Sequence, residues 1–334
     1  AFEDSATKLA TYPECLIRYE WQGTRTAADA RGPETEGGRV LFASYDVDAT
    51  VTRLQRQAVR GACGKTVGFD ELPVLSRDGL KEALRRGVSE SKPFSVLHVL
   101  CHGVPLDSGG TAFGLKWLDR APVMEANIES DLKEFAPTLR LVVLSACSSG
   151  EAGASGSYVG SVAKGVHRAG IEAVVASRLP LSREGSIEFT RQFYQGLIVD
   201  ASSVEEAFLA ARNGLGAPDP RLDARQLETD QLSLQLYARE RDGFDTRPLA
   251  FSPYQGLRPF RREHKRFFCG RDVEVGELVS EFEALVGGGK KPRFMMVMGA
   301  SGSGKSSMVL AGAVPLIEAK GWVSAEILPG DAPL

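Results

Sequence analysis

Two apolar runs that each end in a polar, glycine-containing turn are the feature that most constrains this chain. The first is residues 96–103 (VLHVLCHG), and the second is residues 141–150 (LVVLSACSSG). Continuous apolar runs are typical of parallel strands buried on both faces, and open α/β sheets gather their chemistry at the carboxyl ends of such strands. His102 closes the first run and Cys147 follows the apolar part of the second. We therefore expect both side chains at one edge of an α/β sheet.

A histidine and a cysteine at such strand ends predict nucleophilic catalysis. A thiol attacks a carbonyl carbon only as thiolate, so Cys147 needs a base, and His102 can take its proton and return it to a leaving amine. The spacing of 45 residues (147 − 102) leaves room for one crossover between neighbouring strands. The backbone N–H groups of Gly103 and Cys147 would form an oxyanion hole, worth about 3–4 kcal/mol per donor. The alternative is a buried thiol and a satisfied turn histidine, which we favour for either residue alone but not for the pair.

The motifs around these residues also point to a known family. The first run has the form H-x-x-x-H-G, with His98, His102 and Gly103, and the second has S-A-C at residues 145–147, followed by Ser149-Gly150. In these motifs residues from about 39 to 215 resemble the CHAT domain, a caspase-like peptidase family related to separases and metacaspases. The resemblance implies a cysteine endopeptidase that acts on a partner protein and needs no cofactor for its dyad.

Two other residues of the first run have structural explanations. His98 shares a strand face with His102 but sits deeper in the apolar run, so we interpret it as a buried, hydrogen-bonded residue and assign the base to His102. Cys101 alternates to the other face and is expected in the core.

Substrate specificity is expected to involve acidic residues near the strand ends. In metacaspase-like enzymes an acidic residue two positions before the cysteine helps to bind a basic side chain, but here that position is Ser145. Asp46 and Asp48, which follow the first strand, could replace it. Arg or Lys would then be preferred before the scissile bond. The alternative is that both aspartates are solvated turn residues.

Strands alternate with helices along the first two thirds of the chain, which predicts a parallel α/β sandwich. Besides the two runs, we expect strands at 39–45 and 171–177, a hairpin at 111–123, and helices over 49–59, 76–86, 128–135 and 158–168. Ser182 opens a further helix, and Ser202 with Glu205 forms a capping box before another.

Four segments follow from this pattern. They are an N-terminal segment (1–38), the caspase-like domain (39–217), a linker (218–250) and a last domain (251–334). The linker is rich in Gly, Pro, Asp and Arg, and its alternating Leu232, Leu234 and Leu236 predict one strand that docks on the first sheet.

A phosphate-binding loop lies in the last domain. Residues 293–298 are strand-like, and residues 299–306 (GASGSGKS) match G-x-x-x-x-G-K-S and open a helix. In this motif backbone N–H groups surround phosphate oxygens, Lys305 reaches the β/γ-phosphates, and the Ser306 hydroxyl can hold Mg²⁺. The full set of predicted nucleotide-binding residues is Gly299, Gly302, Gly304, Lys305, Ser306, Ser307 and Arg271. The alternative is a glycine-rich turn without ligand.

Residues 251–334 resemble the start of a STAND signalling ATPase. The motifs are Pro253-Tyr254-Gln255-Gly256-Leu257 and Phe268-Cys269-Gly270-Arg271. The resemblance implies ATP or ADP with Mg²⁺ in the intact domain and places Arg271 near the nucleotide. We expect this segment to be the incomplete front of a P-loop NTPase α/β domain, with its sensor beyond residue 334, and expect no hydrolysis by this part alone.

Composition excludes several classes of protein. Net charge is −3, so we expect no nucleic-acid partner, and no apolar run reaches the 18 residues of a membrane span. The five cysteines, an odd number at scattered positions, argue against a disulfide framework, and none has the spacing of a metal site. We expect a cytoplasmic protein.

The sequence as a whole predicts a caspase-like cysteine endopeptidase controlled by a STAND-type ATP-binding switch. The resemblances imply self-association on activation and cleavage of a partner protein in bacterial defence or cell-death signalling. The competing hypothesis is a non-catalytic CHAT scaffold that acts through nucleotide-dependent assembly.

Overall fold

A computed structural model of the chain describes residues 15–19, 38–64, 67–106, 113–146, 159–178, 181–215, 224–238, 259–287 and 294–327. The chain forms two compact units, Ala1–Ser252 and Pro253–Leu334, and each is described by itself.

The first unit is built on a mixed sheet of eight strands. Their order across the sheet is β1-β8-β7-β6-β4-β2-β3, and β5 pairs with β4 beyond this path. The inner strands are parallel, while β8 runs antiparallel to β7 and β5 antiparallel to β4. This confirms the predicted α/β class with a mostly parallel sheet. The strands are β1 (Arg18–Tyr19), β2 (Arg39–Ser44), β3 (Gly68–Leu72), β4 (Val96–Pro105), β5 (Phe113–Lys116), β6 (Leu141–Ala146), β7 (Ala173–Ser177) and β8 (Leu234–Ala238).

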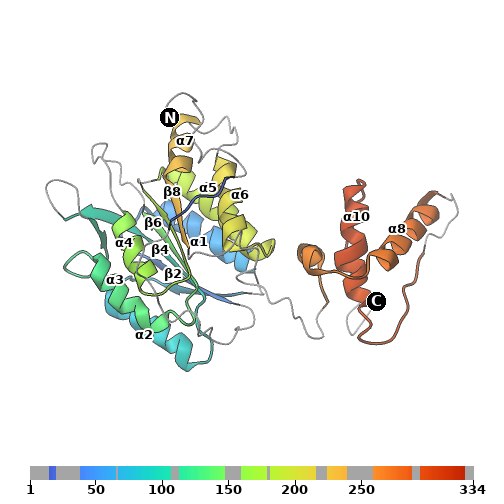
Figure 1. Cartoon of the computed structure of the whole chain (residues 1–334), viewed down its shortest axis with the longest axis horizontal. Coiled ribbons are helices and arrows are strands. Elements are labelled where there is room, and N and C mark those ends of the chain that lie inside the picture. Colours follow the sequence, from blue (N-terminus) through green and yellow to red (C-terminus); the bar gives the residue numbers. More distant parts are fainter. Residues whose placement is uncertain are drawn as a thin grey trace. The chain divides into compact units, whose positions relative to one another are not determined.

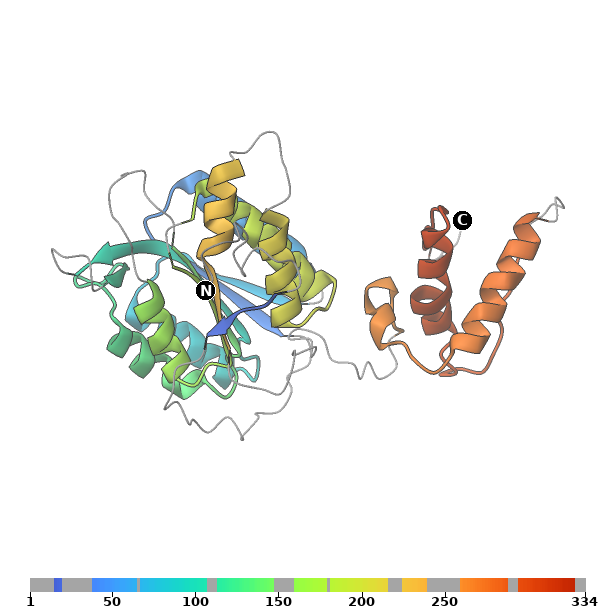
Figure 2. The ribbon, with the colours of Figure 1, turned by 45° about the horizontal axis from the view of Figure 1, so that its top comes forward.

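Helices cover both faces of the sheet (Figures 1 and 2). On one face lie α2 (Arg77–Ser89), α3 (Glu125–Leu132, followed by a 3₁₀ turn at Lys133–Phe135) and α4 (Val159–Arg168). On the other lie α1 (Ala49–Cys63), α5 (Arg183–Tyr194, followed by a π-helical turn at Gln195–Val199), α6 (Val204–Leu215) and α7 (Ala224–Ser233). Each face therefore has its own buried layer, and this double burial explains why the central strands read as continuous apolar runs.

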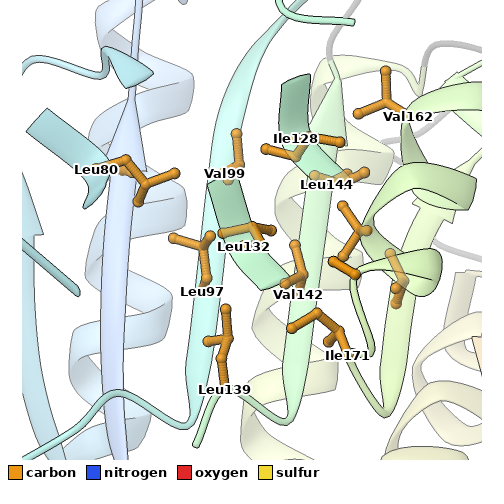
Figure 3. Packing of buried hydrophobic residues seen from close by; sticks show 14 of the residues in the cluster. Leu80, Leu97, Val99, Ile128, Leu132, Leu139, Val142, Leu144, Val162 and Ile171 are labelled. Atoms are coloured by element: carbon orange, nitrogen blue, oxygen red, sulfur yellow. The ribbon is translucent and has the colours of Figure 1, made fainter. Parts of the chain in front are cut away.

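The layer under α2, α3 and α4 is filled by branched aliphatic side chains. Figure 3 shows Leu97 and Val99 of β4 beside Leu144 of β6, with Ile128 and Leu132 of α3 packed over them. All five are at most 4% exposed. Burying such a side chain stabilises the fold by about 1.5–3 kcal/mol, so this layer holds β4 and β6 in place beneath their carboxyl ends.

Serine caps start several helices. Ser76 Oγ accepts a hydrogen bond from Gly79 N, and Ser182 Oγ accepts one from Gly185 N, as the sequence predicts. The capping box before α6 is one residue later than predicted, at Ser203 and Glu206. Ser202 and Ser203 are each followed, three residues later, by a glutamate, so the sequence pattern is compatible with a capping box at either serine. Glu205, the glutamate of the predicted box, is buried and pairs with Arg18 instead.

The segment predicted as a linker contains regular structure that belongs to the first unit. Residues 224–238 form α7 and β8, and β8 lies between β7 and β1. Leu234 and Leu236 are buried in the strand, whereas Leu232 belongs to α7. The predicted docking strand is therefore part of the sheet, and its start is set by the end of the helix.

The predicted hairpin at 111–123 pairs mainly with another strand. β5 runs antiparallel to the end of β4, with His102 opposite Lys116. Within the segment itself, Leu115 and Val123 exchange two backbone hydrogen bonds of 2.9 and 2.8 Å. This arrangement extends β4 past the end of β2.

The second unit contains helices in its described residues. They are a 3₁₀ turn (Arg262–Phe267), α8 (Asp272–Gly287), and a helical run made of α9 (Lys305–Ser307), a π-helical turn (Met308–Ala313) and α10 (Val314–Ala319). The strand predicted at 293–298 is not formed by residues 294–298, and Phe294, Met296 and Met298 are 74, 64 and 78% exposed. A strand needs a hydrogen-bonded neighbour, and none of the described residues pairs with this segment.

Candidate functional site

The predicted base lies at the carboxyl end of a central strand. β4 lies between β2 and β6, and Cys101 of β4 is the register partner of Ala146, the last residue of β6. In the sequence His102 follows Cys101, and Cys147 follows Ala146. Cys147 lies outside the described residues. The two predicted catalytic residues thus come directly after the two members of one cross-strand pair.

His102 belongs to the face of β4 that carries His98. Cys101 is part of the core layer under α2, α3 and α4, as predicted, and Leu100 is part of the layer under α1 and α5. Because side chains alternate along a strand, His98, Leu100 and His102 share the second face. On β6, Ser145 is the partner of Leu100 and is 8% exposed.

The backbone N–H of Gly103 points toward the side of β4 on which β6 lies. Leu100 directs its carbonyl to β2, where it accepts a hydrogen bond from Tyr45 N. On β5, Leu115 stands opposite Gly103 but uses both backbone groups on Val123. Leu115 therefore has no backbone group left for Gly103, and the two residues form a non-hydrogen-bonded pair. Because backbone groups alternate in direction along a strand, those of Gly103, three residues after Leu100, point away from β2 and toward the side of β6. An oxyanion hole at the end of β6 requires this orientation.

His98 is a buried structural residue, as the sequence predicts. Its Nε2 lies 3.1 Å from Gln55 Oε1, its Nδ1 lies 3.2 Å from the Tyr194 hydroxyl, and its ring stacks on Phe42. Because Gln55 offers an acceptor, the neutral ring carries its proton on Nε2 and accepts from Tyr194 at Nδ1. Burial lowers the pKa of His98 to about 3. His98 therefore stays neutral at neutral pH and joins β4 to α1 and α5.

The two predicted pocket aspartates have different surroundings. Asp48 caps α1, since its Oδ1 accepts hydrogen bonds from Thr50 N at 2.9 Å and Val51 N at 3.1 Å, and it also pairs with Arg183 at 2.9 Å. The backbone hydrogen bond from Val51 is the main influence that lowers the pKa of Asp48.

Asp46, in contrast, lies beside the end of β4. Its carboxylate accepts a hydrogen bond from Lys116 Nζ at 2.5 Å. That hydrogen bond is the main influence that lowers the pKa of Asp46, and the charge of His102 also contributes. Of the two aspartates, Asp46 is the one whose carboxylate faces the β4–β5 ladder.

The predicted phosphate-binding loop, residues 299–306, lies within the described part of the second unit. Gly302 and Gly304 have φ angles of 77° and 83°, which favour glycine. Lys305 Nζ donates hydrogen bonds to the carbonyl oxygens of Gly299 at 2.8 Å and Ala300 at 2.7 Å. A Cβ at position 299 would lie only 3.3 Å from Lys305 Cδ. The loop therefore opens a helix with its lysine held against the glycine backbone, and phosphate binding at this loop stays a prediction.

Three other predicted nucleotide residues differ in their contacts. Ser306 is exposed at the start of the helix. Ser307 is 8% exposed, and its hydroxyl accepts a hydrogen bond from Phe260 N at 3.0 Å, so this hydroxyl is used within the unit. Arg271 is half exposed and forms an ion pair with Glu274 at 2.8 Å.

Comparison with known families agrees with this geometry. A family model of the CHAT domain matches residues 44–234, more than half of the chain. The chain belongs to the CHAT family. A model described as Novel STAND NTPase 1 matches residues 253–334. A comparison with curated proteins found no match.

These matches assign a function class to each part of the chain. CHAT domains form a caspase-like cysteine protease family, and the match ends at the start of β8, so the CHAT domain includes about half of the segment predicted as a linker. The STAND NTPase match implies nucleotide binding by the second unit. Together they indicate a protease effector under NTPase control.

Sequence reasoning missed Lys116 as a neighbour of the CHAT domain's predicted base. The alternation of Leu115, Lys116 and Trp117 predicts a strand residue that points away from the core, but its position opposite His102 depends on the β4–β5 register.

Two kinds of feature are absent from the described part of the chain. No helix there is long and apolar enough to cross a membrane. Likewise, within those residues no three His, Cys, Asp or Glu side chains come together in a way that could hold a metal ion.

Proposed function

We propose that the CHAT domain is a cysteine endopeptidase in which Cys147 is the nucleophile and His102 the general base. The register of β4 and β6 carries this proposal, because Cys101 and Ala146, the residues before the dyad, are paired across the two strands. A strand pair separates its Cα atoms by only about 5 Å, so residues that follow at the same edge are well placed for proton transfer.

In this reaction His102 takes the thiol proton, and the Cys147 thiolate attacks the carbonyl carbon of the scissile peptide bond. The N–H groups of Gly103 and Cys147 hold the oxyanion of the tetrahedral intermediate. His102 then donates its proton to the leaving amine, and the carbonyl reforms as a thioester. Water, deprotonated by His102, hydrolyses this thioester and releases the thiol.

The STAND unit is proposed to control this activity through bound ATP or ADP. Lys305 would bind the β/γ-phosphates, and the Ser306 hydroxyl would hold the Mg²⁺ that accompanies the nucleotide. When bound, Mg²⁺ would neutralise part of the negative charge of the nucleotide phosphates. Consistent with the family resemblances, we assign the whole protein to partner-protein cleavage in bacterial defence or cell-death signalling, with self-association on activation.

Thiol labelling tests the dyad directly. Iodoacetamide at mildly acidic pH is expected to modify Cys147 first, because a thiol next to a histidine base is ionised at a pH at which ordinary thiols are still protonated. Cys63 and Cys101 are buried, and burial raises the pKa of Cys63 to about 12, so neither competes. Cys269 is exposed and Cys15 is partly exposed, so these two are the reference thiols with which labelling of Cys147 is compared. Selective labelling that is lost in His102→Ala supports the dyad. Uniform labelling of Cys147 and Cys269 supports the scaffold alternative.

A further inference from the structure

Lys116 is the cross-strand neighbour of the predicted base. β4 and β5 are antiparallel, and their register places Lys116 opposite His102. Directly opposite residues in such a ladder project their side chains to the same face, about 5 Å apart at Cβ. Leu115 and Trp117, on either side of Lys116, are both buried in the opposite layer. The ammonium group of Lys116 therefore belongs to the face of the sheet that carries His102.

The partner of Lys116 is a carboxylate in an unusual backbone conformation. Asp46 has a φ of 54°, in the left-handed region, which aspartate and asparagine adopt more readily than other non-glycine residues. Asp46 accepts the 2.5 Å hydrogen bond from Lys116 Nζ, while Asp48, two residues later, makes the cap that α1 requires. Asp46 thus serves the contact with Lys116 rather than the cap of α1.

The ion pair between Asp46 and Lys116 is also easily exchanged. The side chains of Lys116 and Asp46 are 48% and 53% exposed. Exposed pairs of this kind stabilise a fold little, because water competes for both charges. A guanidinium group can form two parallel hydrogen bonds to a carboxylate, whereas an ammonium group acts as a point charge. An arginine brought by another molecule would therefore replace Lys116 more readily than a lysine would.

We propose that Lys116 is a built-in competitor for a basic substrate side chain: it holds the carboxylate of Asp46 beside His102 until an arginine of the substrate displaces it. The proposal rests on the proposed peptidase function and adds a specificity-determining residue to it. Lys116 would weaken the binding of every basic side chain to Asp46 by the same factor, and preference for arginine over lysine would come from the two parallel hydrogen bonds that a guanidinium group can form.

Matched peptides that differ only at the residue before the scissile bond (Arg, Lys or Gln) test this proposal. Cleavage is measured as KM and kcat with the full chain, and binding is measured separately by fluorescence anisotropy in a Cys147→Ala background. In Lys116→Met the ratio of the KM for the Arg peptide to that for the Gln peptide is expected to fall about two- to fivefold, the value of an exposed ion pair. The ratio for the Lys peptide should fall by the same factor, because the same competitor is removed for both peptides, so that selection of Arg over Lys is unchanged.

Two further variants complete the experiment. Asp46→Asn is expected to raise the KM for the Arg peptide at least about tenfold, because a charge-assisted hydrogen bond is lost. Lys320→Met is the matched control, since Lys320 forms an ion pair with Glu283 of nearly the same exposure, 48% and 51%.

The outcomes separate this proposal from the proposed function. An unchanged Arg-to-Gln ratio in Lys116→Met, or equal binding of the Arg and Gln peptides to the wild-type pocket, overturns the role of Lys116. A change of the same size in Lys320→Met also overturns it. A third outcome is peptide binding that depends on Asp46 and Lys116 as described, while the wild-type protein, which retains Cys147, cleaves none of the peptides. That outcome supports the proposal for Lys116 and contradicts the peptidase function.

Discussion

The Nδ1 atom of His98 lies 3.2 Å from the hydroxyl oxygen of Tyr194, a residue 96 positions further along the chain. Together with the contact between His98 and Gln55 it joins β4 to two helices of one layer. Hydrogen bonds between uncharged side chains thereby hold in place the face of β4 that carries His102.

This network predicts a loss of stability in acid. The pKa of His98 is lowered to about 3 by burial, below its unfolded value of about 6.5. Between these values the unfolded chain binds the proton that the folded protein excludes, so stability falls as pH falls below about 6.5. From pH 7 to pH 5 the contribution of His98 is expected to decrease by about 2 kcal/mol. Urea unfolding of wild type and His98→Gln checks this: the wild type should show the steeper pH dependence, and equal slopes would contradict it.

The dyad predicts strongly non-additive variants. Cys147→Ala and His102→Ala are each expected to reduce cleavage at least about 10³-fold, and the double variant should be little worse, because the two residues act as a unit. Cleavage of a protein substrate, with circular dichroism to check folding, measures this. Cys269→Ser serves as the control, because its exposed thiol lies in the second unit. Persistent cleavage by Cys147→Ala would exclude Cys147 as the nucleophile.

The two aspartates after β2 predict different losses. A peptide library is expected to show Arg or Lys before the scissile bond, and Asp46→Asn should remove that preference. Asp48→Ala should lower the Tm instead, because two backbone N–H groups of the first turn of α1 lose their acceptor. Library profiles and thermal melts of both variants separate these effects. An apolar or acidic preference in the wild type would speak against an acidic pocket.

The capping box before α6 predicts a contrast between adjacent serines. Ser203→Ala should lower the free energy of unfolding by about 1 kcal/mol, because Ser203 Oγ accepts the hydrogen bond from Glu206 N at 3.1 Å. Ser202→Ala should change the free energy by less than about 0.5 kcal/mol. Chemical denaturation of the two variants measures the difference, and a larger effect at Ser202 would restore the box that the sequence suggests.

The predicted phosphate-binding loop leads us to expect that a change in this loop affects ATP binding without altering the reactivity of Cys147. Lys305→Ala is expected to weaken ATP binding at least about tenfold, because a charge-assisted contact to the β/γ-phosphates is lost. In the intact protein it should remove ATP-dependent activation while Cys147 keeps its reactivity toward iodoacetamide. Titration with a fluorescent ATP analogue and cleavage rates with and without ATP check both points. Equal ATP stimulation of wild type and Lys305→Ala would show that this loop is not the switch.

Periodicity and caps in the sequence were sufficient to predict the CHAT unit's class and most of its elements. Continuous apolar runs predicted the central strands because those strands are covered on both faces, and Ser76 and Ser182 predicted helix starts because a cap is a local interaction. The positions of His102 and Gly103 at the end of β4 followed for the same reason.

Contacts between distant segments were decided by the tertiary structure. The register of β4 with β5 places Lys116 beside His102, and packing of α7 makes β8 an inner strand between β1 and β7. Glu205 forms an ion pair with Arg18, which lies 187 residues away in the sequence, instead of the helix cap that the local pattern predicts. A local pattern reports whether a side chain is buried and whether a turn can form. It does not report which strand pairs with which or in what register, because those depend on how the whole core packs.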